Sequence, residues 1–309
     1  MKFRTLGKTG LEVSVLSLGG SSLGSVFGPV DEAEGIQTVH EAIDHGINLL
    51  DNAPFYGLTL AETVMGKALK QIPRDRFLLA TKVGRYGQDD FDFSYDRTIA
   101  CVDESLQRLQ VDHIDIIQAH DMEFGDLHQV IEETLPALRK VVEQGKARFV
   151  GITGYPLKSF QTVIEQAEVD TIQSYCHYSL NNTSLTDLLP ELKARNIGVF
   201  SSAPLSMRLL ADPGPPDWHP APVAIRDRCA EAARFCREQG VDIARLALQF
   251  STAHPDIHTV VVGAGAPDQI RQNIEAIEEP PDEDMLNEVF KILEPIRDQV
   301  WPSGRTENN

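Results

Sequence analysis

Residues Ile47-Asn48-Leu49-Leu50-Asp51-Asn52-Ala53-Pro54-Phe55-Tyr56-Gly57 decide the fold. The first four are apolar or a small amide, and the polarity changes abruptly at Asp51. A short apolar run bounded by turn residues is typical of a strand buried on both faces, as in a parallel sheet. A carboxylate at the carboxyl end of such a strand does not serve packing. Because α/β folds place their chemistry at this end, we expect Asp51 and the nearby Tyr56 to face one cavity above the sheet.

Segments of the same kind recur along the chain. Strands are predicted at residues 15–18, 47–50, 77–81, 114–117, 149–152, 171–174, 197–201 and 260–263. Helices are predicted at residues 31–45, 61–70, 96–109, 126–144, 157–167, 184–195, 223–238 and 242–253, and a hairpin at residues 2–13. Eight strands that alternate with helices over 309 residues predict an α/β fold: a (β/α)8 TIM barrel with an N-terminal β-hairpin and extra helices. An open doubly wound sheet is the alternative.

We expect residues 1–309 to form a single barrel domain. A proline-rich stretch, residues 211–220, interrupts the rhythm between the seventh and eighth strands. Proline does not fit a helix interior or a central strand, so residues 206–223 are predicted to form a loop on the catalytic face. The tail at residues 300–309 is expected to be loose, with Trp301 as the residue that could dock it.

The composition excludes several classes of partner. The formal net charge is −18 and the pI is about 4.8, and such a surface repels nucleic acid and anionic membranes. No apolar run is long enough for a membrane span, and the first residues lack the apolar core of a signal peptide. The four cysteines show no CxxC spacing, which favours free thiols in a reducing compartment. We expect a cytoplasmic protein, as a monomer or a homodimer.

Further polar residues stand after the next two strands. Lys82 and His120 follow the third and fourth predicted strands, so in a barrel they point into the same bowl as Asp51 and Tyr56. A phenol with a pKa of about 10 is a poor base at neutral pH, but a nearby ammonium stabilises the phenolate and lowers that pKa. A carboxylate keeps a half-buried lysine charged. With His120 to hold the substrate oxygen, the set predicts a proton relay that interconverts an alcohol and a carbonyl.

Each of these residues also has an ordinary explanation when it is taken alone. Asp51 could cap a turn, Tyr56 could be a wall residue and Lys82 could be a surface charge. Their joint occurrence at successive strand ends favours the catalytic interpretation. No metal site is expected, because the His and Asp residues around the fourth strand alternate between its two sides: His113, Asp115, His120 and Asp121.

The contexts of these residues resemble the tetrad of the aldo-keto reductase family. The matching segments are Leu50-Asp51-x-Ala53-x-x-Tyr56-Gly57, Ala80-Thr81-Lys82 and Asp115-x-x-x-x-His120, and the resemblance extends from residue 3 to about residue 302. Several loops resemble, within that family, the plant-type L-galactose dehydrogenases: residues 24–30, 91–94, 174–178, 214–220 and 301–304.

The resemblance implies a nicotinamide cofactor and assigns the tetrad its roles. Tyr56 would be the general acid and base, Lys82 and Asp51 would tune it, and His120 would orient the sugar. Thr153, Gly154 and Gln173 match the residues that clamp the carboxamide. The family usually stacks an aromatic ring on the nicotinamide, and Ser202 stands at that position here. The remaining cofactor contacts expected by resemblance are Pro204, Leu205, Arg208, Gly263, Gly265, Gln269, Gln272 and Asn273.

The loop after the last strand bears on the choice between NAD and NADP. Members that prefer NADP usually place a Lys and an Arg there for the 2'-phosphate, and Gly263 and Gln269 replace them here. A dianionic phosphate would lie unpaired next to Asp268, so the sequence predicts NAD rather than NADP. Arg271 is the reservation, because it could swing across.

The reaction implied is oxidation of the ring form of an aldose at C1 to its lactone, with L-galactose as the best guess. Other aldoses such as L-fucose or D-arabinose, or a general aldehyde reduction, are the alternatives. A cofactor-binding regulator without turnover is disfavoured by the intact tetrad. The small sugar would lie against Phe27, Phe55, Tyr86, Phe93 and Trp218, with its hydroxyl groups near Asp121 and His219.

Overall fold

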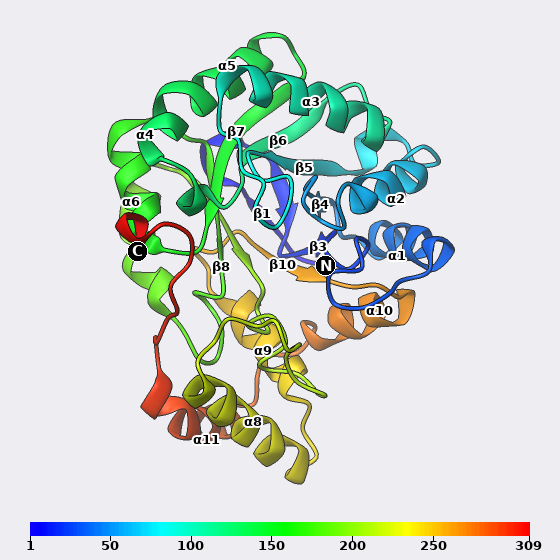
Figure 1. Cartoon of the computed structure of the whole chain (residues 1–309). Coiled ribbons are helices and arrows are strands. Elements are labelled where there is room, and N and C mark those ends of the chain that lie inside the picture. The colour runs from blue at the N-terminus through cyan, green and yellow to red at the C-terminus, as the bar shows by residue number, and fades with distance from the viewer.

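Eight parallel strands form a closed barrel that helices surround (Figure 1). This computed structural model describes residues 1–309. Neighbouring strands follow the order β10-β3-β4-β5-β6-β7-β8-β9. Their bounds are β3 Leu16–Gly19, β4 Leu49–Asp51, β5 Leu78–Val83, β6 Ile114–Ala119, β7 Ala147–Gly154, β8 Thr171–Tyr175, β9 Gly198–Ser202 and β10 Thr259–Gly263. Most of these residues are buried, because helices cover the outside and side chains fill the inside. The predicted (β/α)8 barrel is confirmed.

Eleven α-helices accompany the strands. They are α1 Glu32–Asp44, α2 Leu60–Leu69, α3 Tyr95–Leu109, α4 Leu127–Gln129, α5 Leu135–Glu143, α6 Leu157–Gln166, α7 Leu189–Ala194, α8 Val223–Glu238, α9 Ile243–Ala253, α10 Pro267–Ala276 and α11 Glu283–Leu293. The side chain of Asp31 caps α1 by accepting from two backbone N–H groups of its first turn. Helices α10 and α11 were not among the predicted ones, and one π-helical turn, Val130–Thr134, joins α4 to α5.

Two predicted boundaries move for local reasons. The helix predicted at residues 184–195 becomes a 3-10 turn, Ser184–Asp187, followed by the short α7. Pro190 lacks a backbone N–H, so a new helix begins beside it. Strand β4 begins at Leu49 rather than at residue 47, because the side chain of Asn48 forms hydrogen bonds with the N-terminal hairpin. Its side chain accepts from Ser14 N over 2.8 Å and donates to the backbone of the N-terminal hairpin.

The hairpin closes the N-terminal end of the barrel. Strands β1 Phe3–Thr5 and β2 Glu12–Ser14 pair antiparallel, as predicted. Leu6 and Val13 are fully buried in a cluster with side chains from inside the barrel. Gly7 has a φ of +48°, and a Cβ there would lie 2.5 Å from Gly198 N, so only glycine allows the turn to approach β9 this closely.

The chain after α11 is held rather than loose, which corrects the expectation for residues 300–309. It runs from α11 to the far side of the barrel beside α6 (Figure 1). Trp301 is only 4% exposed and stacks on Tyr155 with centroids 4.8 Å apart. Asn308 donates to the backbone oxygens of Glu123 and Gly125 over 2.8 and 3.0 Å. The aromatic contact and the buried amide fix the two ends of this segment.

The loop between β9 and α8 contains the proline-rich stretch and forms turns without a helix or strand, as predicted. Arg226, in the first turn of α8, donates to the backbone oxygens of His219 and Ala221 and fastens the end of this loop. None of the helices is long and apolar enough to cross a membrane. All four cysteines are free thiols and buried.

Candidate active site

The four tetrad residues meet at the carboxyl ends of β4, β5 and β6. Asp51 ends β4, Lys82 lies one residue before the end of β5, and His120 follows β6 directly. Lys82 Nζ donates to both carboxylate oxygens of Asp51 over 2.8 Å and to Asn52 O over 2.7 Å. It also lies 3.4 Å from the hydroxyl oxygen of Tyr56. Lys82 and Asp51 are each only 1% exposed, so the ammonium is compensated inside the protein.

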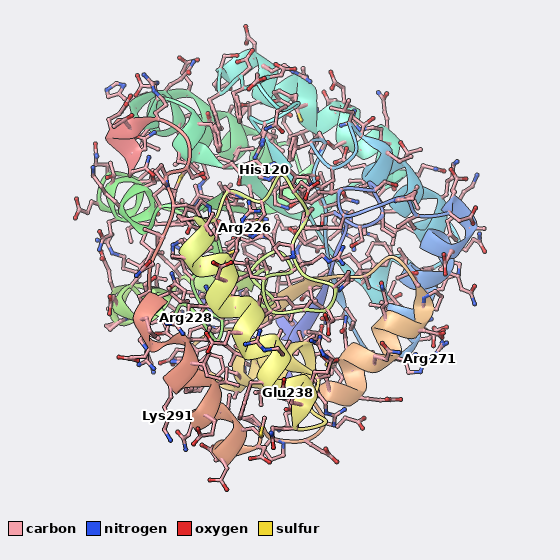
Figure 2. All side chains as sticks on the ribbon, turned by 60° about the horizontal axis from the view of Figure 1, so that its bottom comes forward. His120, Arg226, Arg228, Glu238, Arg271 and Lys291 are labelled. Atoms are coloured by element: carbon pink, nitrogen blue, oxygen red, sulfur yellow. The ribbon has the colours of Figure 1, made fainter.

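The imidazole of His120 stands across from this chain of contacts. Its ring meets that of Tyr56 edge-on, with centroids 5.7 Å apart and planes at 89°. His120 is 3% exposed, and its Nδ1 has no hydrogen-bond partner in the protein. Figure 2 shows His120 above the middle of the view, beyond the N-terminal end of α8. The structure therefore brings all four predicted residues together.

Burial is the main influence on the pKa values of Tyr56 and His120. Burial raises the pKa of Tyr56 well above its usual value, and the charges of Asp51 and Asp121 raise it further, whereas Arg85 lowers it. The sequence predicted a lowered pKa through Lys82, but Asp51 lies against that ammonium and opposes it. Burial lowers the pKa of His120 to about 3. The imidazole is therefore neutral near pH 7, so it can form hydrogen bonds but carries no charge.

Two buried amides lie next to Asp51. Gln173 Nε2 donates to Asp51 Oδ2 over 3.1 Å and to Ser202 Oγ over 2.8 Å. Gln118 Nε2 donates to Gln173 Oε1 over 2.8 Å. Sequence reasoning did not single out Gln118. The available signal was a polar residue inside the apolar run of β6, at a position where the side chain points into the barrel.

The residues expected at the carboxamide lie at the ends of adjacent strands. Thr153 pairs in register with Gln173, and Ser202 follows on the next strand. Thr153 Oγ1 accepts from Asp121 N over 3.1 Å, which ties this strand end to the residue after His120. At Gly154 a Cβ would lie 2.7 Å from Glu123 Oε2, so the carboxyl group of Glu123 would have to shift to admit a side chain. Polar groups thus extend from Asp51 towards β9.

The loops after β9 and β10 contain the turn and the glycines at which cofactor contacts are expected. Ser206, Met207 and Arg208 have successive positive φ values of 46°, 51° and 77° after Pro204 and Leu205, and successive N–H groups in such turns can cradle a phosphate. A Cβ at Gly263 would lie 2.8 Å from Ser22 Oγ, and one at Gly265 would lie 2.7 Å from Val30 Cγ2. Glycine at both positions lets the loop after β10 pack closely against the loop after β3.

Helix α10 carries the other predicted cofactor residues. Gln269 Oε1 accepts from Gly265 N over 2.8 Å. Gln272 is exposed and Asn273 is partly buried. Arg271 pairs with Glu41 and Asp268 and lies at the outer edge of the molecule, far from His120 (Figure 2).

Some predicted substrate residues do lie around the mouth. Phe55 packs near His120, with ring centroids 6.0 Å apart. Asp121 Oδ2 lies 3.6 Å from His120 Nε2. Trp218 is 52% exposed and contacts Phe27 across two loops, with centroids 5.6 Å apart.

Three other predicted substrate residues pack mainly against the protein itself, and for the buried Phe93 and His219 this corrects the sequence analysis. Phe93 is 2% exposed, and its ring lies against Gly84 and Gly125 within the largest apolar cluster. Tyr86 packs against the same cluster and under the guanidinium of Arg97. His219 is 2% exposed and both ring nitrogens are used: Nε2 bonds to Ser206 O and Nδ1 accepts from Ala221 N.

Two charged residues of this region were missed. Arg85 pairs with Asp121, and the only signal was a cation two residues beyond β5. Glu123 is fully buried, and burial raises its pKa to about 8, with a further contribution from Asp121. The residues around Glu123 in the sequence do not predict its burial, because the C-terminal segment that covers it is distant in the chain. No group of three or more His, Cys, Asp or Glu side chains is placed to hold a metal ion.

Comparisons with known proteins agree with this geometry. The chain is 47% identical to the L-galactose dehydrogenase of Arabidopsis thaliana, over 100% of this chain and 99% of that one. It is 33% identical to the D-arabinose 1-dehydrogenase of Saccharomyces cerevisiae, over 77% of this chain and 75% of the relative. The holo form of an aldo-keto reductase from Bacillus halodurans superposes with a TM-score of 0.80 at 29% identity, over 97% of this chain and 98% of that one. Residues 15–294 match the aldo/keto reductase family. The chain therefore belongs to the aldo/keto reductase family, whose oxidoreductases use a nicotinamide cofactor.

Proposed function

We propose that the protein oxidises an aldose at C1 to its lactone with NAD, and that L-galactose is its substrate. The observation that carries the proposal is the buried contact of Asp51, Lys82 and Tyr56, faced by a neutral His120. The identity of 47% over the full chain to an L-galactose dehydrogenase supports the choice of sugar.

In this proposal Tyr56 accepts the proton of the C1 hydroxyl, because its oxygen is the one phenolic oxygen within reach of Lys82. His120 donates a hydrogen bond to the same substrate oxygen and keeps it in line. Lys82 holds the phenolate by charge, and Asp51 keeps Lys82 charged and fixed. The raised pKa of Tyr56 means that oxidation should accelerate as the pH rises, since the deprotonated phenol is the base.

The cofactor residues fit the same scheme. When bound, the nicotinamide supplies the acceptor for the hydride that leaves C1. Thr153, Gln173 and Ser202 would hold the carboxamide, since they form one polar row beside Asp51. The turn at residues 204–208 and the glycines after β10 would hold the pyrophosphate. Gln272 and Asn273 would contact the adenine.

NAD is proposed over NADP because no free cation faces the expected position of the 2'-phosphate. Gly263 and Gln269 stand where the family often has cations, and Gln269 caps Gly265 instead. Arg271, the one basic residue near this loop, is paired with two carboxylates on the outer face of α10. Transfer of Arg271 to a phosphate would break both pairs.

Another aldose is the alternative substrate. The relatives include a D-arabinose 1-dehydrogenase and, at 30% identity, a D-threo-aldose 1-dehydrogenase from a Pseudomonas species. L-Fucose and D-arabinose share the stereochemistry of the ring carbons near C1 with L-galactose, so a pocket that contacts only those centres would accept all three. A cytoplasmic location is proposed with the activity, since the four thiols are free.

A panel of aldoses tested with both cofactors decides the proposal. Formation of reduced cofactor is followed at 340 nm with L-galactose, L-fucose, D-arabinose and D-galactose. We expect the highest kcat/KM with L-galactose and NAD. A higher kcat/KM with NADP would refute the cofactor assignment. The absence of turnover with every sugar, while NAD still binds, would refute the aldose oxidation and favour a cofactor-binding regulator.

A further inference from the structure

Arg85 brings a positive charge into the mouth of the barrel. It follows β5 by two residues, and its side chain is only 12% exposed. The guanidinium carbon lies 3.7 Å from the centroid of the Phe55 ring and 5.0 Å from that of Phe124. Nη1 donates to Asp121 Oδ2 over 2.5 Å. Aromatic rings and one carboxylate therefore fix the plane of this side chain.

Most hydrogen-bond donors of this guanidinium are unused. An arginine offers five N–H donors, and Asp121 is the one acceptor that Arg85 contacts in the protein. Its Nε is buried and has no partner. The buried Nδ1 of His120 also has none, while the other ring nitrogen, Nε2, lies 3.6 Å from Asp121 Oδ2. Unpartnered polar atoms of this kind are costly to bury unless a ligand satisfies them.

The ion pair of Arg85 and Asp121 is a weak explanation for stability by itself. Desolvation of two buried charges offsets most of their attraction. The pair is better suited to a ligand that both donates and accepts hydrogen bonds over a short distance. A sugar hydroxyl does both, so it can donate to Asp121 and accept from Arg85 at the same time.

We propose that Arg85 and Asp121 form a hydroxyl clamp that binds the C2 hydroxyl of the aldose while Tyr56 and His120 hold the C1 hydroxyl. The inference rests on the proposed aldose oxidation and adds a specificity-determining residue to it. Asp121 Oδ2 contacts His120 and Arg85 at once, so the hydroxyl within reach is the one next to C1. The guanidinium of Arg85 stacks on the ring of Phe55, and this ring forms the apolar floor of the clamp.

The clamp is tested by comparing L-galactose with its 2-deoxy analogue in the wild type and in Arg85→Met. We expect the wild type to prefer L-galactose by about 100-fold in kcat/KM, because the analogue leaves the clamp unpaired. Arg85→Met should lose about 100-fold on L-galactose, mostly through KM, and less than about 3-fold on the analogue. The preference between the two sugars should therefore nearly vanish.

Arg97→Met is the matched control. Arg97 also stacks on an aromatic ring, Tyr86 at 4.2 Å, and pairs with Glu104 over 2.9 Å, but it lies on α3. It should leave the preference unchanged. Arg85→Lys keeps the charge without the planar donors, so it should show an intermediate loss, and it replaces Arg85→Met if that variant does not fold.

Two results would overturn the clamp while the aldose oxidation stands. One is an equal loss on both sugars, which would indicate that Arg85 only supports the fold of the site. The other is a preference that stays within about 3-fold of the wild type in both Arg85 variants. If the wild type oxidises no aldose, the proposed function fails first, and the clamp falls with it.

Discussion

Asp51 and Glu123 are both carboxyl groups at the mouth of the barrel, and neither is exposed to solvent by more than 1%. Asp51 receives an ammonium on both oxygens, each at 2.8 Å, and amide donors beside it. Glu123 receives only neutral donors, all on Oε1, among them Ser303 Oγ at 3.0 Å, and its Oε2 has no partner. Burial consequently raises the pKa of Glu123 to about 8.

The difference shows how one end of a barrel can hold two kinds of carboxyl group. A buried carboxylate keeps its charge where a cation lies against it, and it takes up a proton where only dipoles surround it. The region around Asp51 is therefore suited to moving a proton through Tyr56. The region around Glu123 is suited to fastening the C-terminal segment, because a neutral carboxyl can be covered without a counterion.

The largest effect on activity should come from removal of the Tyr56 hydroxyl, which lies 3.4 Å from Lys82 Nζ. Tyr56→Phe removes the proton acceptor, so kcat should fall about 1,000-fold. NAD affinity, measured by titration calorimetry, should change less than about 3-fold, because the phenol contacts the substrate. Tyr178→Phe, which alters a buried tyrosine of the core, should keep the wild-type rate. A Tyr56→Phe enzyme with most of its rate would contradict the role given to the region around Asp51.

Replacement of Lys82 tests whether its ammonium compensates the buried charge of Asp51, a compensation that Glu123 lacks. Lys82→Met leaves Asp51 charged and buried without compensation, which should lower the free energy of unfolding by about 3–5 kcal/mol. Denaturation in urea, followed by circular dichroism, measures the loss. Lys67→Met is the control, because Lys67 pairs with Glu32 at the surface and its loss should cost about 1 kcal/mol or less. Equal losses in the two variants would mean that burial of the pair has no energetic consequence.

Glu123 should make stability depend on pH in a defined direction. Its pKa is higher in the folded protein than the usual value of 4.5, so the folded state binds the extra proton. Its contribution is fully present below pH 4.5 and is lost as the pH rises towards about 8. Glu123→Gln should remove this loss and melt roughly 5 °C above the wild type at pH 9.

Scanning calorimetry between pH 4 and pH 9 measures the effect of Glu123→Gln. Glu143→Gln, at a carboxylate that is 67% exposed, should follow the wild-type curve. If Glu123→Gln melts below the wild type at pH 9, burial does not raise the pKa of Glu123 in the folded state, and the contrast with Asp51 disappears.

The smallest effect concerns the segment that covers Glu123. Asn308→Ala removes the donors to the backbone oxygens of Glu123 and Gly125, and it should cost about 1–2 kcal/mol in urea denaturation. Thr306→Ala, at an exposed position of the same segment, should be neutral. An unchanged stability in Asn308→Ala would indicate that other contacts of the segment, such as those of Trp301 and Ser303, fasten it without this amide.

The barrel and the tetrad were accessible from the sequence for a physical reason. Apolar runs that end in Asp51, Lys82 and His120 predict strands buried on both faces, and parallel strands bring their carboxyl ends to one place. The positions of these residues thus follow from local pattern and topology together.

Side chains on the loops were less accessible. Phe93 and His219 carry the residue types of a sugar pocket, but each turns inward to fill space beside Gly84 or to bond the backbone at Ser206. Glu123 and the C-terminal residues that contact it are 180 and 185 residues apart in the sequence, and no local pattern predicts that contact. Even the direction of the shift in the Tyr56 pKa depends on three-dimensional packing: burial raises it first, and the nearby charges of Asp51 and Asp121 raise it further.

The four buried cysteine thiols can report local unfolding of this protein. Burial raises the pKa of Cys101 and Cys229 to about 12, and all four sulfurs lie inside the structure. A thiol reagent in solution can then react only after a segment has unfolded far enough to admit it. Labelling at Cys101 reports the separation of α3 from the barrel, and labelling at Cys229 reports that of α8. Mass spectrometry of the labelled peptides would order these openings without any introduced cysteine.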